Sequence, residues 1–236
     1  MSRTLEAATL PALESIPGLV HGFEQRLGPA GWEERDQTRR RVAQALADAG
    51  RLHLLKQVHG RRVQAAPWEG RPAADAAVAE APGLILGIET ADCLPVLLVD
   101  PVTRHVAAAH AGWRGTAAGV VREAVAALVA RGSDPSNLVA ALGPAIGPCC
   151  YEVGPELREA FGPDREEVFR PGPRGRPHLD LRAANRRQLE QSGLTAANVH
   201  ELSDCTYCRA DLYHSYRREG KGAGRMVSFV GWRLKS

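Results

Sequence analysis

Three segments of the chain are predicted to be helices, two from apolar side chains at helical spacing and one from its terminal residues. In residues 33–49 the apolar side chains lie on one helical face, and Gly50, which follows, suits a left-handed C-terminal cap. A second helix is predicted over residues 117–130. A third is predicted to begin at Asp180, a good N-cap residue, and to run to Gln191. Because each of the first two helices has one apolar face, both are expected to pack against other elements.

Short, continuous apolar runs predict buried strands between these helices. The run 84–99 is too long for one ordinary strand and contains Asp92 and Cys93, so we predict two strands around a bend that holds both residues. The sequence AGWRG at 111–115 is expected to be a turn, and the Pro/Gly/Arg-rich stretch 170–177 an exposed loop. The other predicted strands are 52–59, 105–110, 138–142, 198–202 and 226–230.

A length of 236 residues with 44% apolar side chains allows one substantial hydrophobic core. We therefore expect a single domain over residues 1–236. Strands and helices mix without the strict βαβ order of a doubly wound fold. The predicted fold class is α+β, with a mixed β-sheet core covered by helices in a three- or four-layer sandwich.

Charge and composition exclude several classes of partner. The 30 basic and 27 acidic side chains leave a formal charge of +3, too small to draw the whole protein onto nucleic acid or a membrane. No apolar segment approaches the roughly 20 residues that cross a bilayer, and residues 1–20 lack the apolar run of a signal peptide. Five cysteines, an odd number, make a poor disulfide framework. We expect a cytoplasmic monomer or homodimer without nucleic-acid or membrane partners.

Three chemically capable residues lie at the ends of predicted buried strands: His59, Cys93 and His110. Two imidazoles and one thiolate form a three-ligand set for a catalytic zinc ion, with a fourth position open to water or substrate. A second interpretation makes Cys93 a nucleophile and His110 its base. A third makes both histidines ordinary loop residues and the cysteine a small buried side chain. Spacing alone does not separate these interpretations.

Six short strings, in order along the chain, resemble one known family. The family was once called multicopper polyphenol oxidases or laccase-domain proteins; its members are now described as purine nucleoside phosphorylases, and some as peptidoglycan editing factors. The resemblance extends from His21 to Trp232. The strings are LKQVHG (55–60), TADCLPVLLVD (90–100), HAGWRG (110–115), GPAIGPCCYEVG (143–154), CTYC (205–208) and SYRREG (215–220).

The resemblance implies a zinc enzyme that acts on purine nucleosides. The family's zinc ligands are the histidine of QVH, the cysteine of ADC and the histidine of HAGWRG, which correspond to His59, Cys93 and His110. The implied reactions are phosphorolysis of adenosine and inosine, cleavage of S-methyl-5'-thioadenosine, and deamination of adenosine. The expected partners are therefore purine nucleosides and phosphate.

Arg26 matches an arginine of the family's N-terminal string and is a candidate contact for phosphate or ribose. An exposed surface role is the alternative. The surrounding EQRLGPAG lacks the Ser-Thr and Gly-Gly that commonly flank this arginine in the family. Thr38 and Arg39 align with an Asn-Arg pair that often opens the next helix, so any contact made by that asparagine is lost here.

The remaining candidate substrate contacts surround the predicted ligands. Gln57 lies two positions before the first ligand histidine, where it either orients the purine or pairs with backbone. Asp92 is placed to support a ligand histidine, to carry a proton, or only to stabilise a turn. Arg114 lies near the start of a predicted helix and either contacts an anion or stays solvated. Arg217 and Arg218 either contact a phosphate or brace the C-terminal strands.

Four cysteines lie outside the predicted zinc set. Cys205 and Cys208 form a Cys-x-x-Cys pair, and Cys149 and Cys150 are adjacent. A structural zinc site needs four ligands, and no second Cys-x-x-Cys or His-x-x-x-His follows the first pair. The adjacent pair is able to contribute in principle, but packing roles are favoured.

Three other functions compete with the purine activity. A copper-dependent polyphenol oxidase needs about ten histidines, largely in His-x-His pairs, whereas this chain has 8 histidines and no such pair. A cysteine or metal hydrolase that edits peptidoglycan precursors would use Cys93 and His110. A non-catalytic protein would keep the metal only for structure. The chain also lacks the phosphate-binding loop GxxxxGK[ST], HExxH, and the HxE and PCxxC strings of cytidine-type deaminases.

Overall fold

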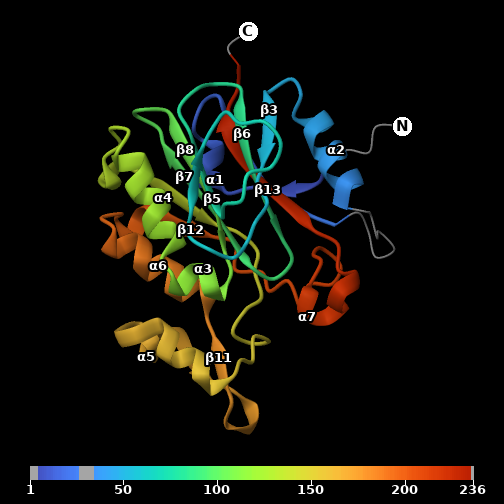
Figure 1. Ribbon diagram of the computed structural model, residues 1–236, viewed down its shortest axis with the longest axis vertical. Helices are drawn as coiled ribbons and strands as arrows, with labels where there is room; N and C mark the ends of the chain where they lie inside the picture. Colours follow the sequence, from blue (N-terminus) through green and yellow to red (C-terminus); the bar gives the residue numbers. More distant parts are fainter. Residues whose placement is uncertain (1–4, 27–34, 235–236) are drawn as a thin grey trace.

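The computed structural model describes residues 5–26 and 35–234 of the chain. Two mixed β-sheets face each other, and helices cover their outer faces (Figure 1). The arrangement is a four-layer α/β/β/α sandwich, and it confirms the predicted α+β class with a mixed sheet core. A short hairpin and the helical segments before it extend from one end of the sandwich.

The first sheet has five strands in the order β1-β2-β13-β6-β3. Only β3 and β6 run parallel; the other neighbours are antiparallel. Its strands are β1 (Ala7–Ala8), β2 (Leu19–Glu24), β3 (Arg51–Leu54), β6 (Leu84–Thr90) and β13 (Met226–Trp232).

The second sheet has six strands in the order β12-β9-β7-β8-β5-β4. Its centre is the antiparallel pair β7 and β8, and its two edge strands run parallel to their neighbours. Its strands are β4 (Val63–Ala65), β5 (Ala76–Ala79), β7 (Leu94–Asp100), β8 (His105–Ala111), β9 (Val139–Leu142) and β12 (Val199–Glu201). A separate hairpin is formed by β10 (Phe169–Pro171) and β11 (Pro177–Leu179).

Two long helices pack on the second sheet and one packs on the first. The α-helices are α1 (Pro11–Glu14), α2 (Arg35–Ala45), α3 (Trp113–Ala117), α4 (Val120–Val129), α5 (Arg165–Val168), α6 (Leu181–Gln191) and α7 (Tyr216–Glu219). The 3₁₀ segments are η1 (Pro135–Asn137), η2 (Pro155–Asp164), η3 (Pro173–Gly175), η4 (Ala196–Asn198) and η5 (Gly220–Gly222).

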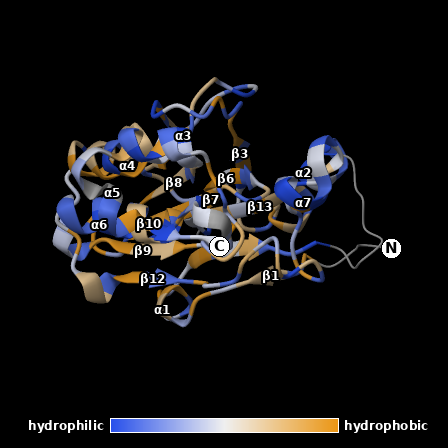
Figure 2. Cartoon of the chain, turned by 90° about the horizontal axis from the view of Figure 1, so that it is seen from below, coloured by the Kyte–Doolittle hydropathy of each residue, from blue (hydrophilic) through white to orange (hydrophobic). Residues whose placement is uncertain are grey.

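The alternation of side chains along β7 separates two of the three apolar layers. Leu94, Val96 and Leu98 point to the layer under α4 and α6, whereas Leu97 and Val99 point to the layer between the two sheets. A third layer lies between the first sheet and α2. Figure 2 shows the resulting pattern, with apolar strands inside and hydrophilic segments on α2 and α6. Strands buried on both faces explain the continuous apolar runs in the sequence.

The bend at Asp92 and Cys93 is where the chain passes from one sheet to the other. β6 belongs to the first sheet and β7 to the second, and only Ala91, Asp92 and Cys93 connect them. The predicted pair of strands around this bend is therefore confirmed. The connection brings the ends of strands from both sheets to one edge of the sandwich.

Several predicted elements differ in extent or kind. The strand predicted at 52–59 ends at Leu54, because the following residues bond to loops, with Lys56 bridging to Ala73. The turn predicted at 111–115 is wrong, since most of it forms the helix α3. The stretch 170–177, predicted to be a loop throughout, is a loop only in its middle. Its two ends belong to the paired strands β10 and β11.

The N-terminal helix is shorter at its end than predicted, because α2 stops at Ala45 and irregular turns lead to Gly50. Its predicted beginning, at residues 33–34, lies outside the described part of the chain. By contrast, α6 has the predicted bounds, and the Asp180 carboxylate accepts a bond from Ala183 N at 3.0 Å. Among residues 5–26 and 35–234, no helix is both long and apolar enough to span a bilayer.

Truncating Leu98 should destabilise the protein, because this fully buried side chain fills the layer under the helices. We expect Leu98→Ala to lower the free energy of unfolding by about 2–5 kcal/mol in a denaturant titration. The matched control is Val102→Ala, whose side chain is 70% exposed and which should change stability by less than about 0.5 kcal/mol. Equal effects from the two variants would contradict the assigned packing.

Candidate functional site

Three residues from separate strand ends meet at the edge of the sandwich: His59, Cys93 and His110. His59 follows β3, Cys93 lies in the bend between the sheets, and His110 lies on β8. Their ligand atoms all lie within 4.8 Å of one another, and the two imidazole ring centroids are 4.8 Å apart. We call these residues the His-Cys-His group. The structure thus brings together the three predicted ligands.

Three positions around the His-Cys-His group are sterically constrained, two by their backbone conformation and one by lack of space for a side chain. His59 and Asp92 adopt left-handed conformations, with φ of 62° and 85°, which non-glycine residues rarely take. At Gly112 a Cβ atom would lie 2.8 Å from Cys93 Sγ and 3.4 Å from His59 Cδ2. Only glycine fits there without displacing a ligand, which accounts for the glycine of HAGWRG.

Asp75, which the sequence analysis missed, holds two of the three candidate ligands in place. Its buried carboxylate accepts backbone bonds from Val58 at 3.1 Å, His59 at 2.8 Å and Gly60 at 2.7 Å. Its Oδ1 also lies 2.8 Å from Nδ1 of His110. An available signal was the lone acidic residue in the apolar stretch AADAAVA, because a charge in a buried strand must have partners.

Within the His-Cys-His group, Cys93 and His110 favour the charged forms of each other. Burial alone would raise the pKa of the Cys93 thiol, but the charge and hydrogen bond of His110, with a smaller effect of His59, lower it to about 6. Burial would likewise lower the pKa of His110, but the Cys93 thiolate and Asp75 raise it to about 9. Without a metal, the pair is therefore thiolate and imidazolium at neutral pH.

The donor set fits a metal ion. Because Nδ1 of His110 is taken by Asp75, its Nε2 is the nitrogen left for a metal, and the carboxylate–imidazole bond is the usual support of a ligand histidine. Thiolate and imidazole are ligands for zinc and copper rather than for calcium or magnesium. With three protein ligands, the set leaves a position for water or substrate.

A cavity of about 680 Å³ opens at the His-Cys-His group. This volume is within the range of about 300–1,000 Å³ usual for small-molecule sites. Seven basic side chains but only two carboxylates line it, so the cavity attracts anions. Three aromatic side chains also line it, Trp113, Tyr151 and Tyr216.

Gln57 and Asp92 both line the cavity, but their polar atoms are already bonded to the protein. The Gln57 amide donates to Glu89 O at 2.7 Å and accepts from Glu89 N at 2.8 Å. Asp92 accepts from Thr206 Oγ1 at 2.6 Å and from Arg217 N at 2.7 Å. The Gln57 side chain therefore pairs with the backbone of β6, and Asp92 fixes two C-terminal segments. Support of a ligand histidine, one role considered for Asp92, is provided by Asp75.

Four arginines of the cavity have no carboxylate partner within the described residues: Arg35, Arg114, Arg217 and Arg225. The Arg114 guanidinium lies 4.3 Å from the Trp113 ring, and Arg217 donates to Glu152 O at 3.0 Å. Arg225 donates to two backbone carbonyls of its own loop. Burial, together with the charge of Arg35, lowers the pKa of Arg225, so an anion would stabilise its charged form.

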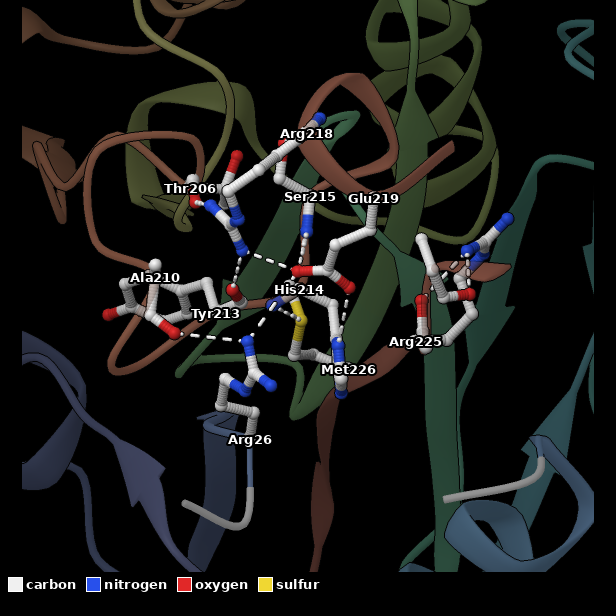
Figure 3. A network of polar contacts seen from close by, with 12 residues as sticks. Arg26, Thr206, Ala210, Tyr213, His214, Ser215, Arg218, Glu219, Arg225 and Met226 are labelled. Atoms are coloured by element: carbon white, nitrogen blue, oxygen red, sulfur yellow. Dashed lines mark hydrogen bonds and ion pairs between the residues drawn. The ribbon is translucent and has the colours of Figure 1, made fainter. Parts of the chain in front are cut away.

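Arg26 does not line the cavity. Its guanidinium donates to Ala210 O at 3.0 Å and lies 3.5 Å from Glu219 (Figure 3). The same carboxylate contacts His214 and Arg218, so Arg26 joins the end of β2 to the C-terminal segment. Arg218 braces that segment as well, by donating to the carbonyls of Thr206 and Tyr213. The string EQRLGPAG, which differs from the family pattern around Arg26, is described only as far as Arg26, and residues 27–31 lie outside the described part of the chain.

The Thr38–Arg39 pair lies on α2 next to the cavity. Thr38 is buried in the helix, whereas Arg39 lines the cavity and binds Glu89 through two nitrogens, at 2.8 and 3.1 Å. Arg71 binds the same carboxylate. Glu89 thus neutralises two of the basic side chains.

Removing the charge of Asp75 should weaken metal binding. An amide in Asp75→Asn cannot match the carboxylate bonds to both the 58–60 backbone and His110, so we expect the affinity for zinc to fall about 10–100-fold. Competition with a chromophoric chelator measures this affinity. Asp134→Asn is the matched control, because Asp134 is an exposed capping residue and asparagine caps equally well. Wild-type affinity in Asp75→Asn would contradict the supporting role.

One family model and several known proteins are similar to this chain. Residues 33–233 match the family model described as multi-copper polyphenol oxidoreductase laccase. Purine nucleoside phosphorylase YlmD of Geobacillus stearothermophilus is 36% identical, over 97% of this chain and 94% of that protein. Adenosine deaminase RL5, from an unknown prokaryotic organism, is 40% identical over 66% of this chain and 61% of that protein.

The fold agrees with a solved relative. The crystal structure of YlmD from Geobacillus stearothermophilus superposes with a TM-score of 0.87 at 30% identity, covering 99% of this chain and 98% of that one. The family model, the YlmD sequence and the YlmD structure therefore agree over most of the chain. The chain belongs to the laccase-like family of multi-copper polyphenol oxidoreductases, whose members similar to it are named purine nucleoside phosphorylases and, in one case, adenosine deaminase.

Proposed function

We propose that the protein is a zinc-dependent purine nucleoside phosphorylase that acts on adenosine, inosine and S-methyl-5'-thioadenosine, with adenosine deaminase activity. The observation that carries this proposal is the three-ligand His-Cys-His group at an electropositive cavity with arginines that no described carboxylate neutralises. Phosphorolysis needs a site for phosphate beside the nucleoside, and deamination needs an activated water. The names of the relatives support both reactions.

Zinc suits the His-Cys-His group better than copper does. A blue-copper centre adds a weak axial ligand, usually methionine, to two histidines and a cysteine. Met226, the methionine of the described residues, does not line the cavity, and its sulfur instead accepts a bond from His214 N at 3.1 Å. A polyphenol oxidase also needs a type-1 and a trinuclear copper centre, which together take about ten histidines, whereas the whole chain has 8.

The substrate groups correspond to two kinds of lining residue. Purine rings stack on aromatic faces, which Trp113, Tyr151 and Tyr216 offer. Phosphate is bound by guanidinium groups through paired hydrogen bonds, which suits Arg114 and Arg225. Arg26, considered for phosphate on sequence grounds, is not assigned this role because it does not line the cavity.

In phosphorolysis a phosphate oxygen forms a bond to C1' of the ribose while the bond between C1' and the purine nitrogen breaks. The electron pair of that bond goes to the purine, which leaves as the free base after protonation, and ribose 1-phosphate remains. Arginine side chains hold the phosphate dianion in line with C1' and prevent its repulsion from the ribose oxygens. A zinc ion held by His59, Cys93 and His110 would supply a Lewis acid and a water of lowered pKa.

Deamination uses the same cavity with water as the nucleophile. The oxygen of water bonds to C6 of adenosine, and the amino group leaves as ammonia, which gives inosine. The Asp75 carboxylate, bonded to Nδ1 of His110, fixes the orientation of this imidazole in both reactions. Phosphate and water attack different carbons, so the two activities differ in how the nucleoside is placed.

A second candidate is a cysteine hydrolase, because Cys93, His110 and Asp75 also form a thiolate–imidazolium–carboxylate series. This enzyme would need no metal. A chelator that abolishes activity, restored by zinc, favours the phosphorylase. Activity that survives the chelator and is lost on alkylation of Cys93 favours the hydrolase.

Product analysis tests the proposed function directly. With adenosine and phosphate, the wild type should release adenine and ribose 1-phosphate; without phosphate, only inosine should form. Cys93→Ala and His59→Asn should both lower each rate by at least about 100-fold, because a bound metal supplies several kcal/mol of transition-state stabilisation. Asparagine is chosen at His59 because it tolerates the left-handed backbone.

The matched control for the histidine variant is His200→Asn, on the edge strand β12 away from the cavity lining. It should keep wild-type rates of both reactions. Absence of any purine product from the zinc-loaded wild type would refute the proposed function, and unchanged rates in Cys93→Ala would remove the metal group from the mechanism.

The assignment of Arg225 to phosphate gives a separate expectation. Arg225→Gln should raise the KM for phosphate about 10–100-fold, since a hydrogen bond to a charged group contributes about 1.5–3 kcal/mol. The rate of deamination without phosphate should change much less. Arg131→Gln serves as control, because its guanidinium pairs with Glu80 away from the cavity. Equal losses of both activities in Arg225→Gln would argue against a phosphate contact.

A further inference from the structure

Four cysteines outside the His-Cys-His group come together in the fold. Cys149 and Cys150 lie in the loop after β9, and Cys205 and Cys208 lie in the turn after β12. Their sulfur atoms all lie within 4.8 Å of one another. We call these four residues the cysteine cluster. The packing roles favoured from the sequence do not account for it, because Cys149 and Cys208 are exposed.

The spacing of the sulfurs is that of ligands to one ion. Cys208 Sγ lies 3.4 Å from Cys150 Sγ and 3.8 Å from Cys149 Sγ. In a tetrahedral tetrathiolate with zinc–sulfur bonds of about 2.3 Å, the sulfurs are about 3.8 Å apart. Four thiol groups this close repel one another once they ionise, so a cation is the natural partner of the ionised cluster.

Backbone amides already point at one of the sulfurs. Gly147 N donates to Cys205 Sγ at 3.2 Å, and the backbone groups of Tyr207 and Cys208 bond to the same sulfur. Bonds from amides within a Cys-x-x-Cys turn favour a charged sulfur and fix its direction. The turn is thus shaped for a thiolate ligand.

We propose that Cys149, Cys150, Cys205 and Cys208 bind one zinc ion in a closed tetrathiolate site, distinct from the His-Cys-His group. Four protein ligands fill the tetrahedron and leave no position for substrate, so this zinc is structural. Binding releases the thiol protons to solvent and changes no oxidation state.

The position of the cysteine cluster gives this zinc a definite structural task. The loop after β9 and the turn after β12 otherwise meet through a bridge between Ala145 and Cys205. The first continues directly into Tyr151, and the second carries Thr206, which bonds Asp92. Zinc would tie the segment that carries the cavity residue Tyr151 to the turn whose Thr206 holds Asp92.

Zinc content per chain tests the site independently of catalysis. Protein purified without a polyhistidine tag, under reducing conditions, is analysed by elemental mass spectrometry. The double variant Cys205→Ser/Cys208→Ser should hold one zinc fewer per chain than the wild type. Tyr207→Phe, in the same turn with all four sulfurs kept, is the control and should hold the wild-type amount. The difference does not depend on whether the His-Cys-His group carries metal or acts on nucleosides.

A second measurement covers the case in which the double variant fails to fold. In Cys93→Ala/His59→Asn, only the cysteine cluster keeps a full ligand set, so cobalt substitution should give the intense visible absorption and thiolate charge-transfer bands of a tetrahedral tetrathiolate. Absence of these bands, equal zinc contents in double variant and wild type, or disulfides among these cysteines in the purified wild type would each overturn the proposal.

Discussion

A buried carboxylate at Asp75 is the contact on which the candidate site depends. Moving a charge from water into the protein is costly unless it is paired and fully hydrogen-bonded. Asp75 satisfies this condition with three backbone amides and one imidazole. The same bonds hold His59 in a left-handed conformation that an unsupported loop would avoid, and they fix which nitrogen of His110 is free. One side chain thus joins the end of β3 to the second sheet.

The periodicity of the sequence predicted the layers better than it predicted the connections. Continuous apolar runs such as 94–99 identify strands buried on both faces, and the Asp180 cap places the start of α6 correctly. The pattern does not say that β6 and β7 belong to different sheets, because pairing partners lie far apart in sequence. Two short neighbouring strands were missed, since β4 and β5 lie in alanine-rich or polar stretches with little periodic signal.

The candidate site was predictable where a motif carries the chemistry and not where long-range contacts decide. His59, Cys93 and His110 were selected as strand-end residues and by resemblance to a family. Arg26 and Gln57 were reasonable candidates for substrate contacts from the sequence. In the structure Arg26 pairs with Glu219, and Gln57 bonds to the β6 backbone. No local pattern distinguishes an arginine paired with a carboxylate from one left without a carboxylate partner. Arg39 pairs with the Glu89 carboxylate, whereas Arg225 bonds only to backbone carbonyl groups. Arginines of the second kind make the electrostatic potential of the cavity positive.

The connection through Cys93 has a consequence for how the enzyme is matured. The three residues proposed as metal ligands follow β3, connect the two sheets and lie on β8, so the group is assembled only after the sheets have packed. The Asp75 bonds then complete it within the protein alone. A metal bound by this group, as proposed above, would enter after folding, and the intrinsic order of affinities favours copper over zinc. The ion carried by a given preparation then reflects metal supply in the producing cell as much as the protein itself.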